Sequence, residues 1–139
     1  MKLSTKGKYG LRALVDLSVH CQDEAVSISS IAQRQEISEG YLEQLMAKLK
    51  KAGIVVSTRG AKGGYSLAIP AGDIMVGDVL RALEGNIDPI DCAGIYGECA
   101  GADSCVTKYL WQQINDGVNK IVNEMTLQSL IDESAKGAC

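Results

Sequence analysis

Three of the five cysteines lie in one stretch of the sequence that is rich in glycine and acidic residues. They are Cys92, Cys99 and Cys105, with the spacing Cys-x6-Cys-x5-Cys. Thiolates gathered in this way can bind a soft metal centre, but the spacing is wider than the Cys-x2-Cys knuckle of structural zinc sites. A bulkier group such as an iron–sulfur cluster fits it better. The alternative is a loop with incidental cysteines, and the rest of the chain has to decide between the two.

Length and composition predict one ordinary domain, or a small domain with an oligomerisation arm. The chain has 139 residues, of which 46% are hydrophobic, enough for a packed core. No apolar run approaches the ~18 residues of a membrane span, and the charged N-terminus is not followed by a signal-peptide core. We therefore expect a cytoplasmic protein with no membrane partner. In a reducing compartment, five cysteines favour metal binding or redox chemistry over disulfides.

Charge is distributed unevenly along the chain. Residues 1–65 carry ten Lys and Arg against six Asp and Glu, a net charge of +4. Residues 66–139 carry four against eleven, a net charge of −7. The first half is therefore where a polyanion would bind, although a modest positive excess is also common on an ordinary solvated face.

Apolar periodicity predicts three helices in the first half. Their apolar stripes are Leu11, Leu14, Val15, Ser18 and Val19 for a helix from about Lys8 to Cys21, and Leu42, Leu45, Met46 and Leu49 for the third helix. A short second helix fits Ile28 to about Gln35, with Ser27 as its N-cap. Ser38 is the expected N-cap of the third helix, and Gly53 lies where a C′ glycine belongs.

The pattern then changes to a period of two. Short strands are expected at residues 54–58 and 65–69, joined by a turn with three glycines and the cations Arg59 and Lys62. Such a hairpin tip lets the backbone lie close to an anion. One more short helix is expected over residues 73–85, closed by Gly85.

A long helix is expected from about Ser104 to Glu124. Its apolar stripe comprises Leu110, Ile114, Val118, Ile121, Val122 and Met125. A helix of this length with its own stripe usually packs on a partner, which predicts a homodimer; the alternative is that it folds back on its own domain. Thr126 is expected to cap a last short turn through Ile131, followed by a frayed tail that includes Cys139.

Three helices followed by a glycine-tipped hairpin predict a mainly α fold with a small β-hairpin wing, a winged helix-turn-helix extended by a long C-terminal dimerisation helix. The polar face of the third helix can enter the major groove of duplex DNA. Glu43 and Gln44 have the chemistry to read base edges, since a carboxylate accepts from cytosine and an amide pairs with adenine. The alternative for each is ordinary helix-surface decoration.

Three segments together resemble one known family. They are Met1–Leu14 (MKLSTKGKYGLRAL), Ser38–Leu45 (SEGYLEQL) and Arg59–Leu67 (RGAKGGYSL). They are similar to the bacterial winged-helix transcription regulators typified by the iron–sulfur cluster regulator IscR, a family that includes nitric-oxide sensors and cysteine-metabolism repressors. The similarity runs to about residue 130. It implies a DNA-binding domain over residues 1–84, a cluster-binding loop over 85–105, and a dimerisation helix with a short terminal helix over 106–134.

The resemblance also implies site residues. It places Ser38, Glu43 and Gln44 in the major groove and Arg59 in the minor groove of double-stranded DNA. Gly40 stands where the best-known relative has a serine, so one polar contact is missing. The three loop cysteines, Cys92, Cys99 and Cys105, match the family's cluster ligands, although the first gap is one residue longer. The cluster is expected to be 2Fe-2S, with 4Fe-4S as the alternative.

The fourth cluster ligand departs from the family pattern. Where the best-known relative has a histidine three residues after the last cysteine, this chain has Lys108. Nitric-oxide sensors take a ligand from the start of the partner's first helix, but here that stretch offers Lys8 and Arg12, which are cations and poor ligands. The open candidates are His20, Cys21, Asp91, Glu98, Asp103 and a deprotonated Lys108.

The leading hypothesis is a transcription regulator that senses iron–sulfur cluster status, with a regulator of cluster biogenesis as the expected role. The alternative within the family is a repressor that senses nitric oxide or thiol redox state. Carboxylates near the cysteines argue against a thiol sensor without metal, because they raise thiol pKa values. A third hypothesis, an iron–sulfur carrier that does not bind DNA, leaves the wing without a purpose. Nothing in the sequence predicts an enzyme: there is one histidine and no phosphate-loop or nucleophile-elbow motif.

Overall fold

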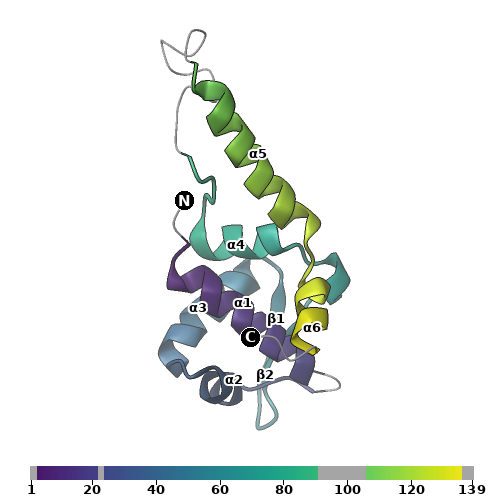
Figure 1. Ribbon diagram of the computed structural model, residues 1–139. Coiled ribbons are helices and arrows are strands. Elements are labelled where there is room, and N and C mark those ends of the chain that lie inside the picture. Colours follow the sequence, from purple (N-terminus) through teal and green to yellow (C-terminus); the bar gives the residue numbers. More distant parts are fainter. Residues whose placement is uncertain (1–2, 22–23, 91–105, 136–139) are drawn as a thin grey trace.

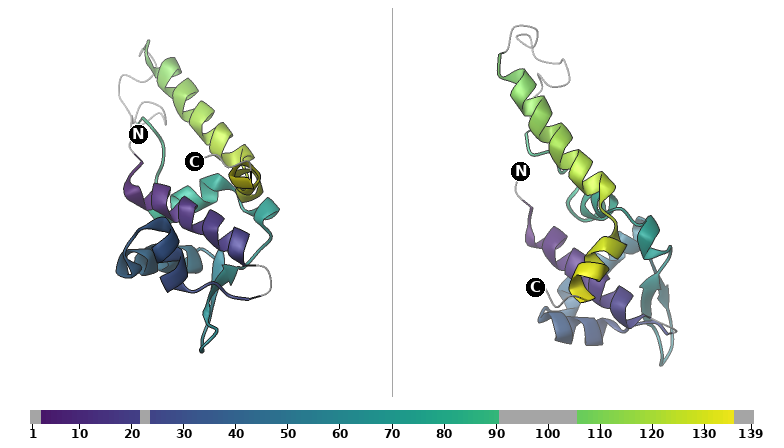
Figure 2. Two further views of the ribbon diagram at one scale, coloured as in Figure 1. Left: turned by 60° about the horizontal axis from the view of Figure 1, so that its bottom comes forward. Right: turned by 45° about the vertical axis from the view of Figure 1, so that its right-hand side comes forward.

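The computed structural model describes residues 3–21, 24–90 and 106–135 (Figure 1). Its elements, in chain order, are α1 (Thr5–His20), α2 (Ile28–Gln35), α3 (Glu39–Lys51), β1 (Val55–Thr58), β2 (Gly64–Leu67), the 3-10 turn η1 (Ala71–Asp73), α4 (Val76–Glu84), α5 (Lys108–Glu124) and α6 (Leu127–Ala135). Helices α1 to α4, α6 and the hairpin form a body, and α5 projects from it as an arm (Figures 1 and 2). The predicted fold class is confirmed.

The two helices of the helix-turn-helix begin at the serines expected to cap them. The side chain of Ser27 accepts a hydrogen bond from the Ser30 N–H at 3.2 Å, and Ser38 accepts one from the Tyr41 N–H, also at 3.2 Å. Each cap satisfies a backbone donor that the first helical turn leaves unpaired. Gly53, just after α3, has the positive φ of 79° expected of a C′ residue.

The buried face of α1 differs from the predicted one. Leu14 is fully buried, but Val19 is 41% exposed, and Leu11, Val15 and Val19 line a groove beside α6. The buried face instead includes Gly7 and Gly10. A Cβ on Gly10 would lie 2.2 Å from Leu83 Cδ1, so the glycine lets α4 approach α1 closely. A pattern built on large apolar residues misses this face because glycine contributes nothing to it. Helix α1 also begins three residues before its predicted start.

The hairpin is the predicted antiparallel wing, with slightly shorter strands. Its register pairs Val55 with Leu67 and Thr58 with Gly64. Val26 forms an isolated antiparallel bridge with Tyr65 and ties the wing to the segment between α1 and α2. Gly64 has φ +155°, and a Cβ there would lie 2.2 Å from the Val26 carbonyl oxygen, so this close pairing requires glycine.

One apolar core holds the body together. Its fully buried side chains include Leu14, Leu17, Ile31, Leu42, Leu45, Met46, Leu49, Ile74, Leu83 and Leu127. Leu127 belongs to α6, which is a nine-residue helix rather than the short turn predicted after Thr126. The Leu127 N–H donates to the Ile74 carbonyl, and Met75 bridges to Thr126. These pairings hold residues 74–75 extended, so α4 begins at Val76 and not near Asp73 as predicted.

Helix α5 packs on α4 through residues that include Val122 in its C-terminal half. Val122 joins a small apolar cluster with Val76, Leu80 and Ile87. Towards the other end Leu110 is 49% exposed, and Ile121, which lies on the same side of the helix as Leu110 and away from Val122, is 60% exposed. The helix begins at Lys108 rather than near Ser104, which lies outside the described residues. Among the described helices, none is both long and apolar enough to cross a membrane.

Candidate nucleic-acid interface and cysteine segment

The outer face of α3 is polar and open to solvent. Its apolar side, Leu42, Leu45, Met46 and Leu49, is buried in the core. Its exposed polar residues are Glu39, Glu43, Gln44, Lys48, Lys50 and Lys51. The structure therefore places the predicted base-reading residues Glu43 and Gln44 on the face that is free to meet a ligand. The cations lie in the last turn, where they also complement the helix dipole.

The start of α3 is fastened to the start of α1. Tyr41 Oη lies 2.9 Å from Thr5 Oγ1, and the Tyr41 ring meets the Tyr9 ring edge-on at a centroid distance of 6.3 Å. The Arg12 guanidinium lies over the Tyr9 ring, 5.2 Å from its centroid. Ser38 is exposed, and its Oγ caps the helix as an acceptor, which leaves its hydroxyl proton available for a further acceptor.

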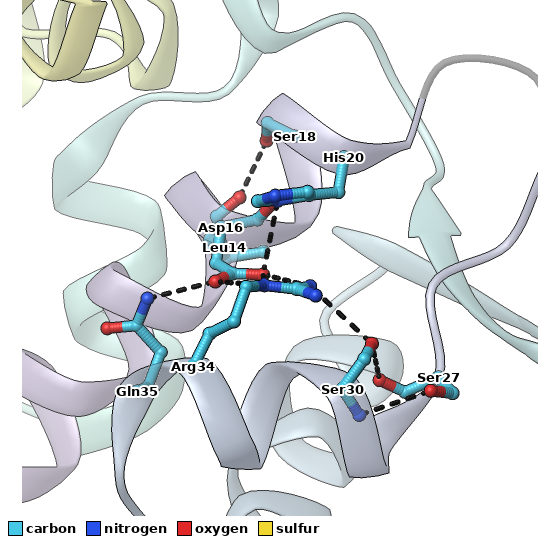
Figure 3. A network of polar contacts seen from close by, with 8 residues as sticks. All are labelled: Leu14, Asp16, Ser18, His20, Ser27, Ser30, Arg34 and Gln35. Carbon is cyan, nitrogen blue, oxygen red and sulfur yellow. Dashed lines mark hydrogen bonds and ion pairs between the residues drawn. The ribbon is translucent and has the colours of Figure 1, made fainter.

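A polar network that the sequence did not reveal joins α1 to α2 (Figure 3). Asp16, whose side chain is 3% exposed, receives hydrogen bonds from Arg34 at 2.6–3.1 Å and from Gln35 at 2.9 Å. His20 Nδ1 lies 2.8 Å from the Asp16 carbonyl oxygen and 3.5 Å from its carboxylate. The sequence signal that could have revealed this network is Asp16 itself, an acidic residue among the apolar positions of α1. An acidic side chain needs a partner when it is buried.

The network keeps Asp16 ionised. Burial opposes ionisation of this carboxyl, but the hydrogen bonds from Arg34 and Gln35 and the charges of Arg34 and His20 outweigh burial and hold the pKa of Asp16 below its ordinary value. The same contact raises the pKa of Arg34. Both charges therefore persist at neutral pH, and the contact between α1 and α2 includes a charged pair whose hydrogen bonds are satisfied.

The wing carries its charges at the tip. Arg59 directly follows β1 and is exposed, as is Lys62, which lies 3.7 Å from Glu24. Lys50 Nζ donates to Ser57 Oγ at 2.7 Å and links α3 to β1. The predicted wing residue Arg59 and the predicted α3 residues thus belong to two elements that one hydrogen bond and the shared core hold together.

The predicted cluster ligands Cys92, Cys99 and Cys105 lie outside the described residues. So do Asp91, Glu98 and Asp103 among the candidates for a fourth ligand. Lys108 begins α5, at the end of the arm farthest from the body, whereas His20 and Cys21 lie at the C-terminal end of α1 within the body (Figure 1). Within one chain, His20 and Cys21 are therefore remote from Lys108. No group of three or more His, Cys, Asp or Glu arranged to hold a metal occurs in the described part of the chain.

Comparison with known proteins places the chain among bacterial regulators. The model of the Rrf2 family, described as iron-dependent transcriptional regulators, matches residues 3–133. The chain is 40% identical over 134 residues to the HTH-type transcriptional regulator IscR of Vibrio atlanticus, covering 96% of this chain and 77% of that protein. It is 40% identical over 132 residues to IscR of Pectobacterium carotovorum, covering 95% of this chain and 80% of that protein.

Solved structures agree with the sequence relatives. CymR, the global cysteine regulator of B. subtilis, has a TM-score of 0.82 at 38% identity and covers 96% of this chain and 98% of that chain. IscR of T. potens has a TM-score of 0.78 at 40% identity and covers 100% of this chain and 92% of that chain. The resemblance to IscR-type regulators is confirmed, and the relatives are named as regulators rather than enzymes. The chain belongs to the Rrf2 family of transcriptional regulators.

Proposed function

We propose that this protein is a DNA-binding transcription regulator whose affinity for its operators depends on an iron–sulfur cluster bound by Cys92, Cys99 and Cys105. The observation that carries the proposal is a coincidence within one chain. The match to a family described as iron-dependent regulators spans residues 3–133, and that span contains both the three cysteines and the exposed face of α3. Neither feature alone would link iron to DNA.

The DNA-binding half is supported by exposure and charge. A helix with its side chains is about as wide as the major groove, so the exposed Glu43 and Gln44 of α3 can reach base edges. Ser38, at the N-terminus of the same helix, still has a hydroxyl proton to donate to a phosphate. Arg59 on the wing reaches the adjacent minor groove, where a guanidinium is attracted by the negative potential of narrow A·T-rich sequence.

The cluster-binding half is supported by the chemistry of the donors. Three thiolates suit iron–sulfur centres, and the segment is too widely spaced for a zinc knuckle. Lys108 stands where the family resemblance places a histidine, so three thiolates and a weaker fourth ligand would hold the cluster less firmly than four thiolates. When bound, the cluster supplies a ligand whose differential affinity for two conformations of the protein shifts the DNA-binding equilibrium.

A homodimer completes the proposal. Leu110 and Ile121 of α5 and Met125, which directly follows it, are exposed by 39–60% in the single chain. Large apolar side chains on a projecting helix are stabilised when a second copy covers them. Two copies would also present two recognition helices to a two-fold symmetric operator.

A second candidate is a regulator that responds to thiol or cysteine status without a cluster. The likeness to the global cysteine regulator CymR favours it, at a TM-score of 0.82 over nearly the whole chain. Iron and acid-labile sulfide in anaerobically purified protein separate the two candidates. A colourless, iron-free protein that binds DNA would support the second.

Substitution of single cysteines tests the leading proposal. Cys92→Ser should bleach the visible absorption of anaerobic protein, and Cys99→Ser and Cys105→Ser should do the same. Cys21→Ser is the matched control: Cys21 ends α1 in the body and should be dispensable for the cluster. Cys139→Ser should likewise have no effect. If Cys92→Ser retained full iron and sulfide, the ligand assignment would be wrong.

A further inference from the structure

Three asparagines recur at every fourth position of α5 and place their side chains on one face of the helix. They are Asn115, Asn119 and Asn123. Asn115 is 4% exposed, and of the 17 residues of α5, all of which the structure describes, it is the only one that is buried. An amide is costly to bury without partners, so hydrogen bonds must explain why this helix buries an asparagine rather than one of its apolar residues.

Both polar atoms of the Asn115 side chain bind the backbone of one residue. Oδ1 accepts a hydrogen bond from the Ile90 N–H at 3.0 Å, and Nδ2 donates to the Ile90 carbonyl at 3.1 Å. Two residues exchange both bonds in the same way when they form a hydrogen-bonded pair between antiparallel strands. A two-point contact fixes the orientation of the backbone at Ile90 as well as its position on α5.

The neighbouring asparagines extend this contact towards the body. Asn119 Nδ2 donates to Asp88 Oδ1 at 3.0 Å, and its Oδ1 accepts from Arg81 Nη2 at 2.8 Å. Asn123 Oδ1 accepts from Arg81 Nη1 at 2.9 Å. Arg81 belongs to α4, so the asparagine ladder, formed by Asn115, Asn119 and Asn123, makes two kinds of contact. Asn123 and Asn119 join α5 to α4, whereas Asn119 and Asn115 hold residues 88–90.

We propose that Asn115 is a positioning residue for the cysteine ligands: it fixes, against α5, the residue from which the chain continues into the cysteine segment. Ile90 precedes Cys92 by two residues, and Lys108, the first residue of α5, follows Cys105 by three. The contact therefore ties the residue just before the proposed ligands to the helix that begins just after them. This inference rests on the proposed function, because it concerns the same cluster.

The physical reason is conformational entropy. Residues 91–105 include three glycines, which have the most backbone freedom to lose when ligands are ordered around a metal centre. A fixed start to the segment removes part of that cost before the cluster binds, which is preorganisation. Asn115 acts through the backbone of Ile90 rather than as a ligand. Substituting a residue that orients metal ligands through hydrogen bonds typically lowers metal affinity 10–100-fold.

The test compares iron release from full-length protein carrying Asn115→Leu, Asn115→Ser or Asn123→Ala. Leucine is close in size to asparagine but binds neither backbone group, and a serine hydroxyl is too short to bridge both. Asn123→Ala removes a side chain of the same ladder that hydrogen-bonds to Arg81 of α4. We expect iron to transfer to a chelator about tenfold faster from Asn115→Leu than from wild type. The rate for Asn115→Ser should lie between those two, and the rate for Asn123→Ala should equal that of wild type.

Two further measurements separate positioning from general destabilisation. In cluster-free protein, amide hydrogen exchange at Ile90 should be faster in both Asn115 variants, while the melting temperature and the sedimentation coefficient stay close to those of wild type. If Asn115→Leu fails to fold, the serine variant carries the comparison. Iron release from the folded Asn115 variants at the wild-type rate, or equally fast release from Asn123→Ala, would overturn the inference and leave the proposed function standing. A wild-type protein that binds no iron would overturn both.

Discussion

The body and the arm of this molecule are held in place by different forces. In the body, Leu14, Leu42 and Leu49 are fully buried, and Gly10 lets α4 approach α1 closely. In the arm, α5 exposes Leu110 and Ile121 to solvent and buries Asn115. The body is therefore stabilised mainly by apolar burial within one chain. Helix α5 is held by hydrogen bonds together with the packing of Val122, and it retains apolar surface for another contact.

This difference matches the functions proposed for the two regions, DNA binding for the body and the response to the cluster for the arm. A DNA-reading surface needs rigid support, which a close-packed core provides. A ligand-responsive arm needs a local structure that can change without unfolding the whole domain, and polar contacts near a glycine-rich segment allow this. Substitutions in the two regions should therefore have separable effects.

The largest effect on stability is expected from the core of the body. Leu14→Ala should lower the free energy of unfolding by about 2–5 kcal/mol, because removal of the fully buried side chain leaves a cavity in the core. Urea denaturation followed by circular dichroism measures this loss. Val19→Ala, on the same helix but 41% exposed, should cost less than about 1 kcal/mol. Equal losses for the two variants would contradict the assigned face of α1.

The buried ion pair should have an intermediate effect. Asp16→Ala leaves Arg34 and Gln35 without their shared acceptor, but the Arg34 side chain is 35% exposed, so solvent reduces the loss to roughly 1–3 kcal/mol. Asp78→Ala is the control, because Asp78 is 71% exposed in its ion pair with Arg81. That variant should change stability by less than about 0.5 kcal/mol.

The Asp16 effect should depend on pH in one direction. The pKa of Asp16 is lower in the folded protein than in the unfolded chain, so its ionised form stabilises the fold at pH values above the unfolded pKa of about 4. This stabilisation is lost as the pH falls through the folded pKa. The difference in stability between wild type and Asp16→Ala should shrink on acidification below about pH 4. A difference that grew on acidification would refute the ion-pair account.

Substitutions on the proposed DNA-facing surface should change binding rather than folding. Arg59→Ala should weaken binding to all cognate sites by roughly 1–3 kcal/mol, as expected for a good specific contact. Glu43→Ala should instead relax sequence preference, because a carboxylate near phosphates is repelled unless a cytosine amino group satisfies it. Binding isotherms on cognate and scrambled duplexes at one salt concentration decide between these effects. Equal weakening on both duplexes by Glu43→Ala would remove this residue from the account of specificity.

The smallest effect on folding is expected from the arm. Leu110→Ala should change the free energy of unfolding of the body by no more than about 0.5 kcal/mol, because the side chain is half exposed in the single chain. It should nevertheless weaken self-association by roughly tenfold if a second copy covers the arm. Sedimentation of cluster-free protein measures this, and the wild type should remain dimeric without the cluster. A monomeric wild type at micromolar concentration would disprove the proposed interface.

Local signals in the sequence were sufficient for the helix-turn-helix and the wing. Ser27 and Ser38 cap α2 and α3 as predicted, and Gly53 and Gly85 follow the helices that they were expected to close. The predicted DNA-facing residues lie on exposed surface because the apolar stripe of α3 leaves only one face for them. These features follow from the sequence because residues within one or two turns of each other determine them.

Contacts between distant segments decided the features that the sequence did not predict, namely the buried face of α1, the start of α4, the length of α6 and the buried polar residues. Whether the valines or the glycines of α1 face the core depends on α4, which lies about 70 residues further along the chain. The extended residues 74–75 and the full length of α6 depend on each other's backbone hydrogen bonds. Asp16 and Asn115 look like ordinary polar residues in the sequence, and only their partners, Arg34 and Ile90, show why they are buried. A buried polar group is stable only where its partner is present, and only the tertiary structure brings such partners together.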